Sequence, residues 1–126
     1  MARPLNVLLI TSDQQHHTAL GCVNPLIKTP ALDRLAREGT RFSRAYCNNP
    51  VCSPSRSTII TGLYPSWHHC WMIGVRLPED VPAVGDIFMK NGYATGLVGK
   101  AHFQPLGSSP GSACTRERFQ RREDAR

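Results

Sequence analysis

Short apolar runs alternate along the chain with stretches that have the spacing of amphipathic helices. The first run, at 6–11 (NVLLIT), is apolar and rich in β-branched residues, which is typical of a strand buried on both faces of a parallel sheet. Runs at 40–46 and 93–98 are the other candidate strands. Strands that alternate with helices at these lengths predict an α/β fold with a mainly parallel sheet flanked by helices.

Each helix is predicted from its start and stop signals. A capping residue followed by proline favours a helix start, and glycine favours the left-handed conformation that ends a helix. These signals predict helices from Thr29-Pro30 to Gly39, from Ser53-Pro54 to Gly62, and from Ala83 to Asn91. Gly39 is expected to be left-handed. The stretches 12–28 and 63–82 have no clean period and are predicted to be loops.

The character of the sequence changes after Phe103. The next residues are rich in proline, glycine and serine, and the end of the chain is polar and rich in arginine, with no hydrophobic period. Three strands alone would also form a small sheet with exposed edges. We therefore expect residues 1–103 to be the N-terminal part of a larger domain and residues 104–126 to form a disordered tail.

Composition excludes several classes of protein. The chain has 126 residues, of which 40% are hydrophobic and 19% are charged, which fits one globular domain and excludes a fibrous or wholly disordered chain. Its longest apolar run, Val7–Ile10, is far shorter than the roughly 20 residues that cross a bilayer. No run has the length of a secretory signal. We therefore expect a cytoplasmic protein without a membrane partner.

Charge and cysteine content bear on which partners and which kinds of site are expected. The net charge is +6, but nothing besides this charge favours a nucleic-acid partner, so none is predicted. The five cysteines are odd in number and irregularly spaced, which argues against a disulfide framework and against a zinc or redox site. At least one cysteine is therefore expected to act as a thiol or as a product of thiol oxidation.

Cys52 and Arg56 are the first candidate site residues. Cys52 immediately precedes the second predicted helix, whose first N–H groups and positive dipole end favour an anion such as sulfate or phosphate. Arg56 lies one turn into that helix and provides a permanently charged fork for tetrahedral oxyanions. A nucleophile, a helix dipole and a guanidinium directed at one point suit attack on a sulfuryl or phosphoryl centre.

This segment resembles a known family motif. It reads Cys52-Ser53-Pro54-Ser55-Arg56, followed by Thr61-Gly62, and is similar to the C-x-P-S-R…T-G motif of the sulfatase family in the alkaline-phosphatase-like superfamily. The resemblance covers about residues 5–103, so it implies a partial, truncated alkaline-phosphatase-like fold. It also implies hydrolysis of a small-molecule sulfate ester after a formylglycine-generating enzyme oxidises Cys52 to formylglycine. The hydrated aldehyde attacks sulfur, and its second hydroxyl then expels sulfate.

Asp13 and Gln14 follow the first predicted strand, and the carboxyl end of a parallel strand is the expected place for a site. The resemblance implies that Asp13 binds a divalent cation, usually calcium, together with the oxidised Cys52. Gln14 stands where many arylsulfatases have a second aspartate, and its carbonyl could ligate calcium without adding charge. A structural turn cap is the alternative role for Asp13.

The segment from Gly92 to Phe103 resembles a second motif of the family, in which a strand ends in Gly-Lys with a histidine nearby. The resemblance implies that Lys100 contacts the sulfate oxygens and that His102 hydrogen-bonds the formylglycine diol. Ala101 replaces the aromatic residue that many members have between them. Solvated surface side chains are the alternative for both residues, and their position after a buried strand favours the site.

Two pairs of histidines offer a weaker candidate site. His16 and His17 are adjacent, as are His68 and His69, so the side chains of each pair are expected to point apart. No third ligand has a suitable spacing for zinc. All four are therefore interpreted as loop residues. Trp67 and Trp71 are interpreted as packing for that loop, with the lining of a substrate mouth as the alternative.

Other functions stay open at this point. The later part of a complete sulfatase supplies further metal ligands and another histidine and lysine, so little or no turnover is expected of this chain alone. A phosphonate or phosphate monoester hydrolase of the same superfamily is the nearest alternative, slightly favoured by Gln14. A non-catalytic fragment is the alternative outside the enzymes.

Overall fold

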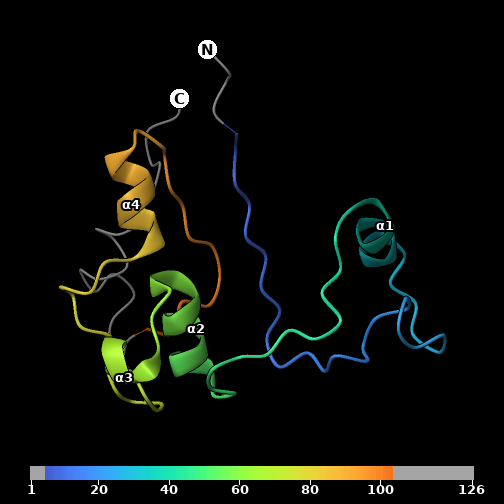
Figure 1. Cartoon of the computed structure of the whole chain (residues 1–126), viewed down its shortest axis with the longest axis horizontal. Coiled ribbons are helices and arrows are strands. Elements are labelled where there is room, and N and C mark those ends of the chain that lie inside the picture. Colours follow the sequence, from blue (N-terminus) through green and yellow to red (C-terminus); the bar gives the residue numbers. More distant parts are fainter. Residues whose placement is uncertain (1–4, 104–126) are drawn as a thin grey trace. The chain divides into compact units, whose positions relative to one another are not determined.

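Four helices form the regular secondary structure of residues 5–103, the part of the chain that the computed structural model describes (Figure 1). The chain divides into two compact units, Met1–Ala45 and Tyr46–Arg126. Among the described residues, the first unit contains one helix and the second contains three. They are α1 (Pro30–Glu38), α2 (Cys52–Thr61), α3 (Pro65–His68) and α4 (Val84–Lys90).

In the first unit, the start of α1 is tied to the loop before it. The Thr29 hydroxyl accepts a hydrogen bond from the Gly21 N–H (2.8 Å) and donates one to Asp33 Oδ1 (2.9 Å). The same carboxylate oxygen accepts the Cys22 N–H (2.8 Å). Thr29 therefore precedes the helix, as predicted, but its side chain bonds the loop and does not cap the helix N–H groups.

The bounds of α1 agree with its sequence signals, because Pro30 is its first residue and Gly39 follows its last. The prediction that Gly39 is left-handed is wrong. Its φ of −119° and ψ of −155° are those of extended backbone, which any residue can adopt. No residue of α1 is buried, and Leu35 is 61% exposed. The apolar face of α1 is therefore uncovered within the described residues of its unit.

In the second unit, α2 contacts both α3 and α4 (Figure 1). It begins at Cys52, earlier than predicted, because Val51 is already extended and its carbonyl accepts the Ser55 N–H (3.0 Å). The helix ends at Gly62, as predicted. The φ of 71° at Gly62 is left-handed, a conformation that glycine adopts without the penalty of a side chain.

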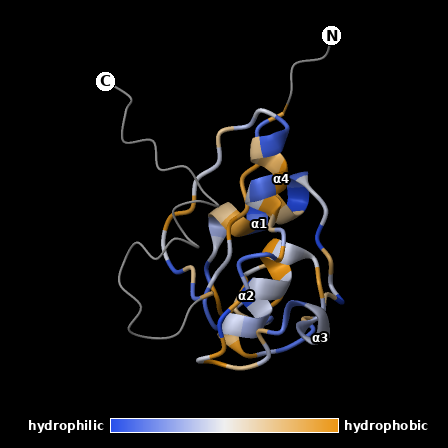
Figure 2. Ribbon diagram, turned by 90° about the vertical axis from the view of Figure 1, so that its left-hand side faces the viewer, coloured by the Kyte–Doolittle hydropathy of each residue, from blue (hydrophilic) through white to orange (hydrophobic). Residues whose placement is uncertain are grey.

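The other two helices of this unit are short. Helix α4 lies within the predicted 83–91 segment, and the Asp86 carboxylate caps its start by accepting the Ala83 N–H (2.8 Å). Hydrophobic and hydrophilic residues occur side by side along it (Figure 2). Helix α3 is a single turn that begins at Pro65. It lies inside the segment predicted to be a loop.

Five of the described residues form the core of the second unit. Leu77 is fully buried, and its N–H donates a hydrogen bond to the Phe103 carbonyl (3.0 Å). This bond attaches the last described segment to the chain between α3 and α4. The core residues come from α2, from the segments around α3 and α4, and from that last segment: Ile60, Cys70, Leu77, Ala83 and Phe103.

Residues 5–103 contain no β-strand, so the predicted parallel sheet is not confirmed. The segment at 6–11 follows an extended path (Figure 1), but a strand needs a neighbour about 4.8 Å away in the hydrogen-bonding direction. No β-bridge forms there, nor at 40–46 or 93–98. The composition of a segment predicts that it can be a strand, whereas pairing depends on a partner elsewhere in a structure.

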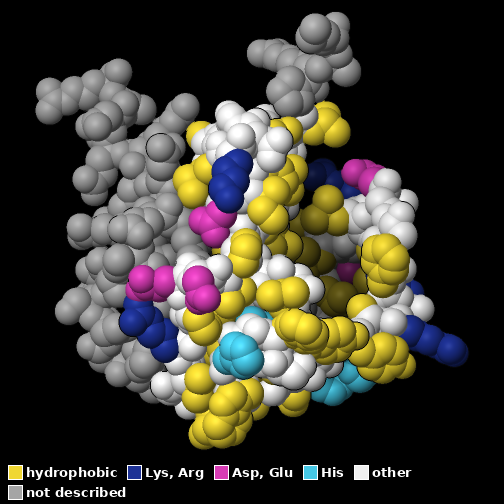
Figure 3. Space-filling model, turned by 60° about the vertical axis from the view of Figure 1, so that its left-hand side comes forward, with side chains coloured by type: hydrophobic (Ala, Val, Ile, Leu, Met, Phe, Trp, Pro, Cys, Tyr) yellow, Lys and Arg dark blue, Asp and Glu magenta, His cyan; other side chains and the backbone are white. Residues whose placement is uncertain are grey.

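Hydrophobic side chains are widely exposed on the described part of the chain (Figure 3). They include long aliphatic and aromatic residues from both units, and exposed apolar surface of this extent is typical of an interface. None of the helices within 5–103 combines the length and the apolar character that crossing a membrane requires.

Candidate active site

Cys52 is the first residue of α2, at the end where helix N–H groups point outward. Its thiol is free and half-buried. Val51 before it has no side-chain acceptor, so no side chain caps this helix start, and the first turn contains no acidic residue. The positive end of the helix dipole at Cys52 is therefore not neutralised by a carboxylate of its own first turn.

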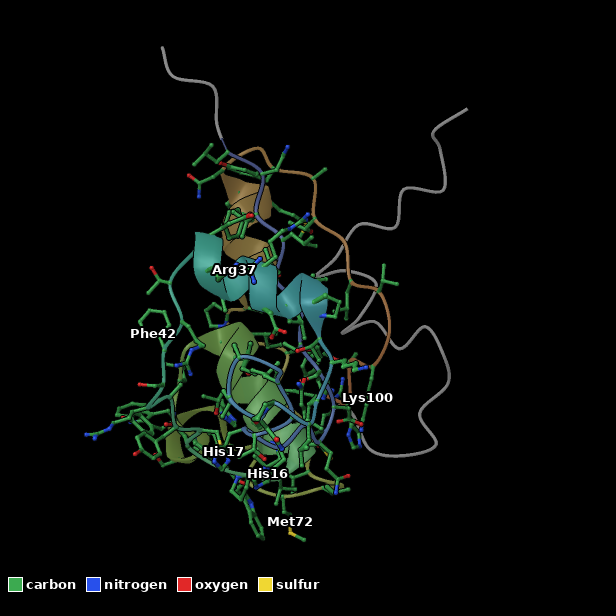
Figure 4. All side chains as sticks on the ribbon, turned by 90° about the vertical axis from the view of Figure 1, so that its right-hand side faces the viewer. His16, His17, Arg37, Phe42, Met72 and Lys100 are labelled. Carbon is green, nitrogen blue, oxygen red and sulfur yellow. The ribbon has the colours of Figure 1, made fainter. Side chains whose placement is uncertain are left out.

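Arg56 links this helix to a distant segment of the same unit. It follows Cys52 by four residues and so lies near it on one face of α2. Arg56 Nη1 donates a hydrogen bond to the backbone carbonyl oxygen of Lys100 (2.7 Å), across 44 positions of sequence. The Lys100 side chain is exposed, and its position is labelled in Figure 4. The structure thus joins the segments of the two sequence motifs.

His102 lies on the segment that this bond holds. Its ring is half-buried, and neither ring nitrogen has a hydrogen-bond partner within the described chain. Its φ of 59° is in the left-handed region, which is uncommon for a residue with a side chain. Ala101 packs against the core and Phe103 belongs to it, so both neighbours fix the backbone of His102. Buried polar atoms are normally paired, so this imidazole is suited to a group that residues 5–103 do not supply.

Two hydroxyl groups on the buried face of α2 also lack a hydrogen-bond partner within the described residues. Ser53 is 2% exposed and Ser57 is fully buried, and neither oxygen has a partner in the part of the chain that the structure describes. They are four residues apart and lie on one side of the helix, next to Cys52 and Arg56 in sequence. Unpaired buried hydroxyls cost stability, so they mark another place where partners are missing from these residues.

His68 is a structural residue of this unit that sequence reasoning misplaced. It ends α3, is fully buried, and accepts the Cys70 N–H at Nδ1 (3.1 Å). Because Nδ1 accepts, Nε2 carries the proton and donates to the Thr58 hydroxyl on α2 (3.0 Å). Burial lowers the pKa of His68 below its ordinary value. The interpretation of His68 as a loop residue is therefore wrong, and no signal in the spacing of the histidines could have revealed its role.

The loop before α2 is bonded to the chain after α3. Asn49 accepts the Val51 N–H through Oδ1 (2.9 Å), and its Nδ2 donates to the Trp71 carbonyl (3.4 Å). The side chain of Trp71 is 59% exposed, and that of Trp67 is 72% exposed. The prediction that these tryptophans pack the loop is therefore wrong, because both side chains are largely exposed and neither belongs to the core of the unit.

Asp13 and Gln14 lie in the first unit, whereas Cys52, Arg56, Lys100 and His102 all lie in the second. The structure therefore groups the four residues predicted for catalysis in one unit. The two predicted cation ligands, Asp13 and Gln14, belong to the other unit, and their role as ligands remains a prediction. Gln14 has a φ of 52° and is left-handed.

His16 and His17 closely follow Asp13 and Gln14 in sequence and lie in a loop, as predicted. The rings of His16 and His17 are 4.3 Å apart between centroids (Figure 4), so the prediction that they point apart is wrong. His16 Nδ1 lies 2.9 Å from the Thr18 hydroxyl. Both rings are exposed, and the contact is a local one between neighbours.

The described residues do not by themselves make a calcium site. Calcium takes six to eight oxygen ligands, and residues 5–103 contain no cluster of three or more His, Cys, Asp or Glu side chains that could hold a metal ion. A calcium ion would need Asp13 together with ligands from other parts of a protein.

Comparison with known proteins establishes the family. The sulfatase family model matches residues 5–123, which includes every site residue discussed above. The chain belongs to the sulfatase family. The matched range extends past residue 103, where the sequence analysis placed the end of the domain. Residues 104–126 lie outside those that the structure describes, so the predicted boundary and tail remain predictions.

Curated sulfatases are similar to this chain over most of its length. An ulvan-active sulfatase from Formosa agariphila is 38% identical over 98 residues, covering 77% of this chain and 19% of that protein. Arylsulfatase A from Homo sapiens is 37% identical over 122 residues, covering 90% and 23%. The chain thus spans about a fifth of the length of the curated relatives it matches.

A solved sulfatase structure is similar to this chain in its backbone. The yidJ sulfatase from Bacteroides fragilis aligns with a TM-score of 0.65 and 35% identity, over 69% of this chain and 21% of that one. The sulfatase chain trace, of the alkaline-phosphatase-like fold, is therefore present over the matched part, although the sheet is not formed within residues 5–103. Sulfatases generally use a formylglycine and a divalent cation.

Proposed function

We propose that this chain provides the nucleophile-bearing part of a sulfuric ester hydrolase of the arylsulfatase type. The bond from Arg56 to the Lys100 carbonyl is the observation that supports this most, because it holds the segment of Lys100 and His102 against the helix of Cys52. Family membership supports the reaction class. The chain spans about a fifth of its relatives, so activity is proposed for the complete domain and little or none for this chain alone.

Each residue has a role that follows from its surroundings. Cys52, once oxidised to formylglycine, would supply the hydroxyl that attacks sulfur. The uncapped first turn of α2 favours the negative charge that develops on the sulfuryl oxygens. Arg56 would add positive charge there, and the family resemblance implies the same role for Lys100. His102, with both nitrogens unpaired in the described chain, can exchange a proton with the diol.

A divalent cation, with Ca²⁺ as the first choice, belongs to this proposal as well. Asp13 and Gln14 would be its ligands together with the oxidised Cys52. Since no cluster of ligands forms within residues 5–103, further ligands would have to come from elsewhere in the domain. A formylglycine-generating enzyme is the partner that the modification of Cys52 requires.

The modification is tested by co-expressing the full chain with a formylglycine-generating enzyme and mapping its peptides by mass spectrometry. We expect the aldehyde at Cys52 and an unmodified thiol at Cys47, which is an exposed cysteine of the same unit. Equal oxidation of both cysteines would indicate nonspecific chemistry, and an unmodified Cys52 would contradict the proposed maturation.

The activity is tested in a chimera that places residues 5–103 in the Bacteroides fragilis sulfatase, in exchange for the matching segment. We expect hydrolysis of an aryl sulfate that Cys52→Ala abolishes and calcium supports. Cys47→Ala is the matched control and should leave the rate within about twofold, as expected of an exposed position away from the site. A chimera that folds and takes up the modification but does not turn over would contradict the proposal.

A phosphonate or phosphate monoester hydrolase is the second candidate, favoured by Gln14. A neutral amide in place of a carboxylate makes a cation site less negative, which favours a more highly charged substrate anion. Sulfate and phosphonate esters of one aryl alcohol, compared in the same chimera, distinguish the two functions. A non-catalytic role would leave both esters intact.

A further inference from the structure

Trp71 lies beside the segment that leads into the cysteine helix. The Asn49 side chain accepts the Val51 N–H at Oδ1 (2.9 Å), and its Nδ2 donates to the Trp71 carbonyl (3.4 Å). Val51 is the residue immediately before Cys52. One amide group and two hydrogen bonds therefore span the distance between the backbone of Trp71 and that of the residue next to the proposed nucleophile.

The backbone on both sides of Trp71 is held in place. Cys70 is fully buried in the core, its N–H donates to His68 Nδ1 (3.1 Å), and its thiol donates to the Val75 carbonyl (3.1 Å). The Met72 carbonyl accepts the Val75 N–H (3.2 Å), which closes a turn after Trp71. Trp71 itself is 59% exposed. An exposed ring on a fixed backbone is preorganised for binding, because little conformational freedom is lost when a ligand packs against it.

Apolar side chains continue from Trp71 along this turn. Met72 is 44% exposed and Ile73 is 42% exposed, and Figure 4 shows the Met72 side chain pointing away from the ribbon. Residues 70–75 read CWMIGV and include no charged side chain and no hydroxyl, amide or carboxylate side chain. Aromatic and aliphatic side chains of this kind are the main lining of sites for small molecules.

The charges of this part of the chain limit which ligand fits beside Trp71. No Lys, Arg, Asp or Glu occurs between Arg56 and Arg76, so the turn does not complement a polyanionic chain. A sugar ring would need hydrogen-bond partners for its hydroxyls, which the side chains of 70–75 do not offer. A flat, neutral aromatic group needs neither and packs favourably against an indole.

We propose that Trp71 is a specificity-determining residue that packs against the organic group of an aromatic sulfate ester whose sulfate lies at the start of α2. This inference rests on the proposed hydrolase function for the place of the sulfate, and it adds the class of alcohol and the side chain that selects it. Because the ring contacts the alcohol and not the reacting sulfur, it contributes binding that is equal in the ground state and the transition state.

The experiment titrates the full chain with naphthyl sulfate and follows the indole N–H signals by NMR. The chain contains two tryptophans, so Trp71→Phe and Trp67→Phe assign the two signals. We expect naphthyl sulfate to shift the Trp71 signal and to leave the Trp67 signal unchanged. Methyl sulfate, which has no ring, and glucose sulfate, which has a hydroxylated ring, should each bind at least about fivefold more weakly.

Two matched substitutions separate a specific contact from general adhesion to exposed aromatic rings. Trp67 is the control, because it lies on α3 and is 72% exposed. Trp71→Ala should weaken the binding of naphthyl sulfate about fivefold, measured by magnetisation transfer to the naphthyl protons, and Trp67→Ala should weaken it less than about twofold. In the chimera, Trp71→Ala should raise KM for this ester about fivefold and keep kcat within about twofold, as expected when uniform binding is lost.

Each outcome decides the inference. It is overturned if naphthyl sulfate leaves the Trp71 signal unshifted, shifts both indole signals equally or binds no better than glucose sulfate, or if the two alanine variants lose affinity equally. A chimera that hydrolyses naphthyl sulfate with an unchanged KM in Trp71→Ala would overturn the inference and leave the hydrolase function standing. A chimera without turnover, beside a selective shift of the Trp71 signal, would contradict the hydrolase function and support the role of Trp71.

Discussion

Leu8 and Leu77 are the same side chain in opposite surroundings. Leu8 lies in the first unit and is 83% exposed, whereas Leu77 lies in the second and is fully buried. Leu77 belongs to a segment whose N–H bonds Phe103 and whose side chain contacts a core. Leu8 belongs to a more strongly apolar segment that has no partner among the described residues. Hydrophobicity indicates that a segment will be buried, but the surface that buries it has to be present.

The largest predicted effect concerns this pair of leucines. Leu77→Ala should lower the free energy of unfolding by about 2–5 kcal/mol, because it leaves a cavity in the core. Leu8→Ala should change it by less than about 0.5 kcal/mol, as expected at an exposed position. Urea titrations followed by tryptophan fluorescence measure both. Equal losses in the two variants would mean that the apolar segment is buried in solution.

A second contrast compares two neighbouring histidines. His68→Asn should cost about 1–3 kcal/mol, because the shorter side chain cannot reach the Thr58 hydroxyl and leaves a buried group unpaired. His69→Asn is the matched control. It is exposed and left-handed with a φ of 59°, a conformation that asparagine tolerates, so its unfolding midpoint should stay unchanged. A similar loss in both would contradict the assigned bonds of His68.

A third contrast compares two glycines. A Cβ at Gly21 would lie 2.4 Å from Asp33 Oδ2 and 2.9 Å from the Ile27 carbonyl, whereas a Cβ at Gly96 would meet no atom within 4 Å. Gly21→Ala should cost about 1 kcal/mol or more by displacing the carboxylate that bonds the loop. Faster hydrogen exchange at the Cys22 N–H is the measurement. Gly96→Ala should leave that exchange rate unchanged, and an unaffected rate in Gly21→Ala would contradict the predicted clash.

The smallest predicted effect is a pH dependence of the second unit. Burial lowers the pKa of His68 in the folded chain, so below the ordinary value of about 6.5 the unfolded state binds more protons than the folded state. Stability should therefore be full above that pH and should fall as the pH decreases. The loss should be smaller than in His68→Asn, because protonation of Nδ1 breaks the Cys70 bond and keeps the Thr58 bond.

Urea midpoints at pH 7.5 and 5.5, measured on the chain and on His68→Asn, test this dependence. Only the chain with histidine should lose stability between the two values. A matching loss in the asparagine variant would assign the effect to other groups.

The helices were predictable because their signals are local. Pro30 and Gly62 determine a start and an end through their own backbone preferences. Gly39 shows the limit of this reasoning, because glycine permits the left-handed conformation without requiring it. The start of α2 at Cys52 was misplaced by a short distance for a similar reason, since Val51 is extended without being a typical cap.

The strands and the buried histidine were not predictable in the same way. A strand at 6–11 depends on a neighbour that residues 5–103 do not provide. The burial of His68 depends on Thr58 and Cys70, which no pattern of spacing connects to it. The site residues were proposed from a family resemblance, and the bond between Arg56 and Lys100 is the tertiary contact that agrees with it.

The attachment of Phe103 has a consequence for how short a working segment can be. The Phe103 side chain belongs to the core and its carbonyl accepts the Leu77 N–H. These contacts anchor the backbone segment that contains Lys100 and His102. A shortened gene product that stopped at Ala101 would keep the entire cysteine helix and its guanidinium. It would nevertheless lose His102 and the Phe103 attachment to Leu77, and would keep only the Arg56 bond to the Lys100 carbonyl. The stability of the motif-bearing segment therefore depends on an aromatic residue far from the nucleophile in sequence.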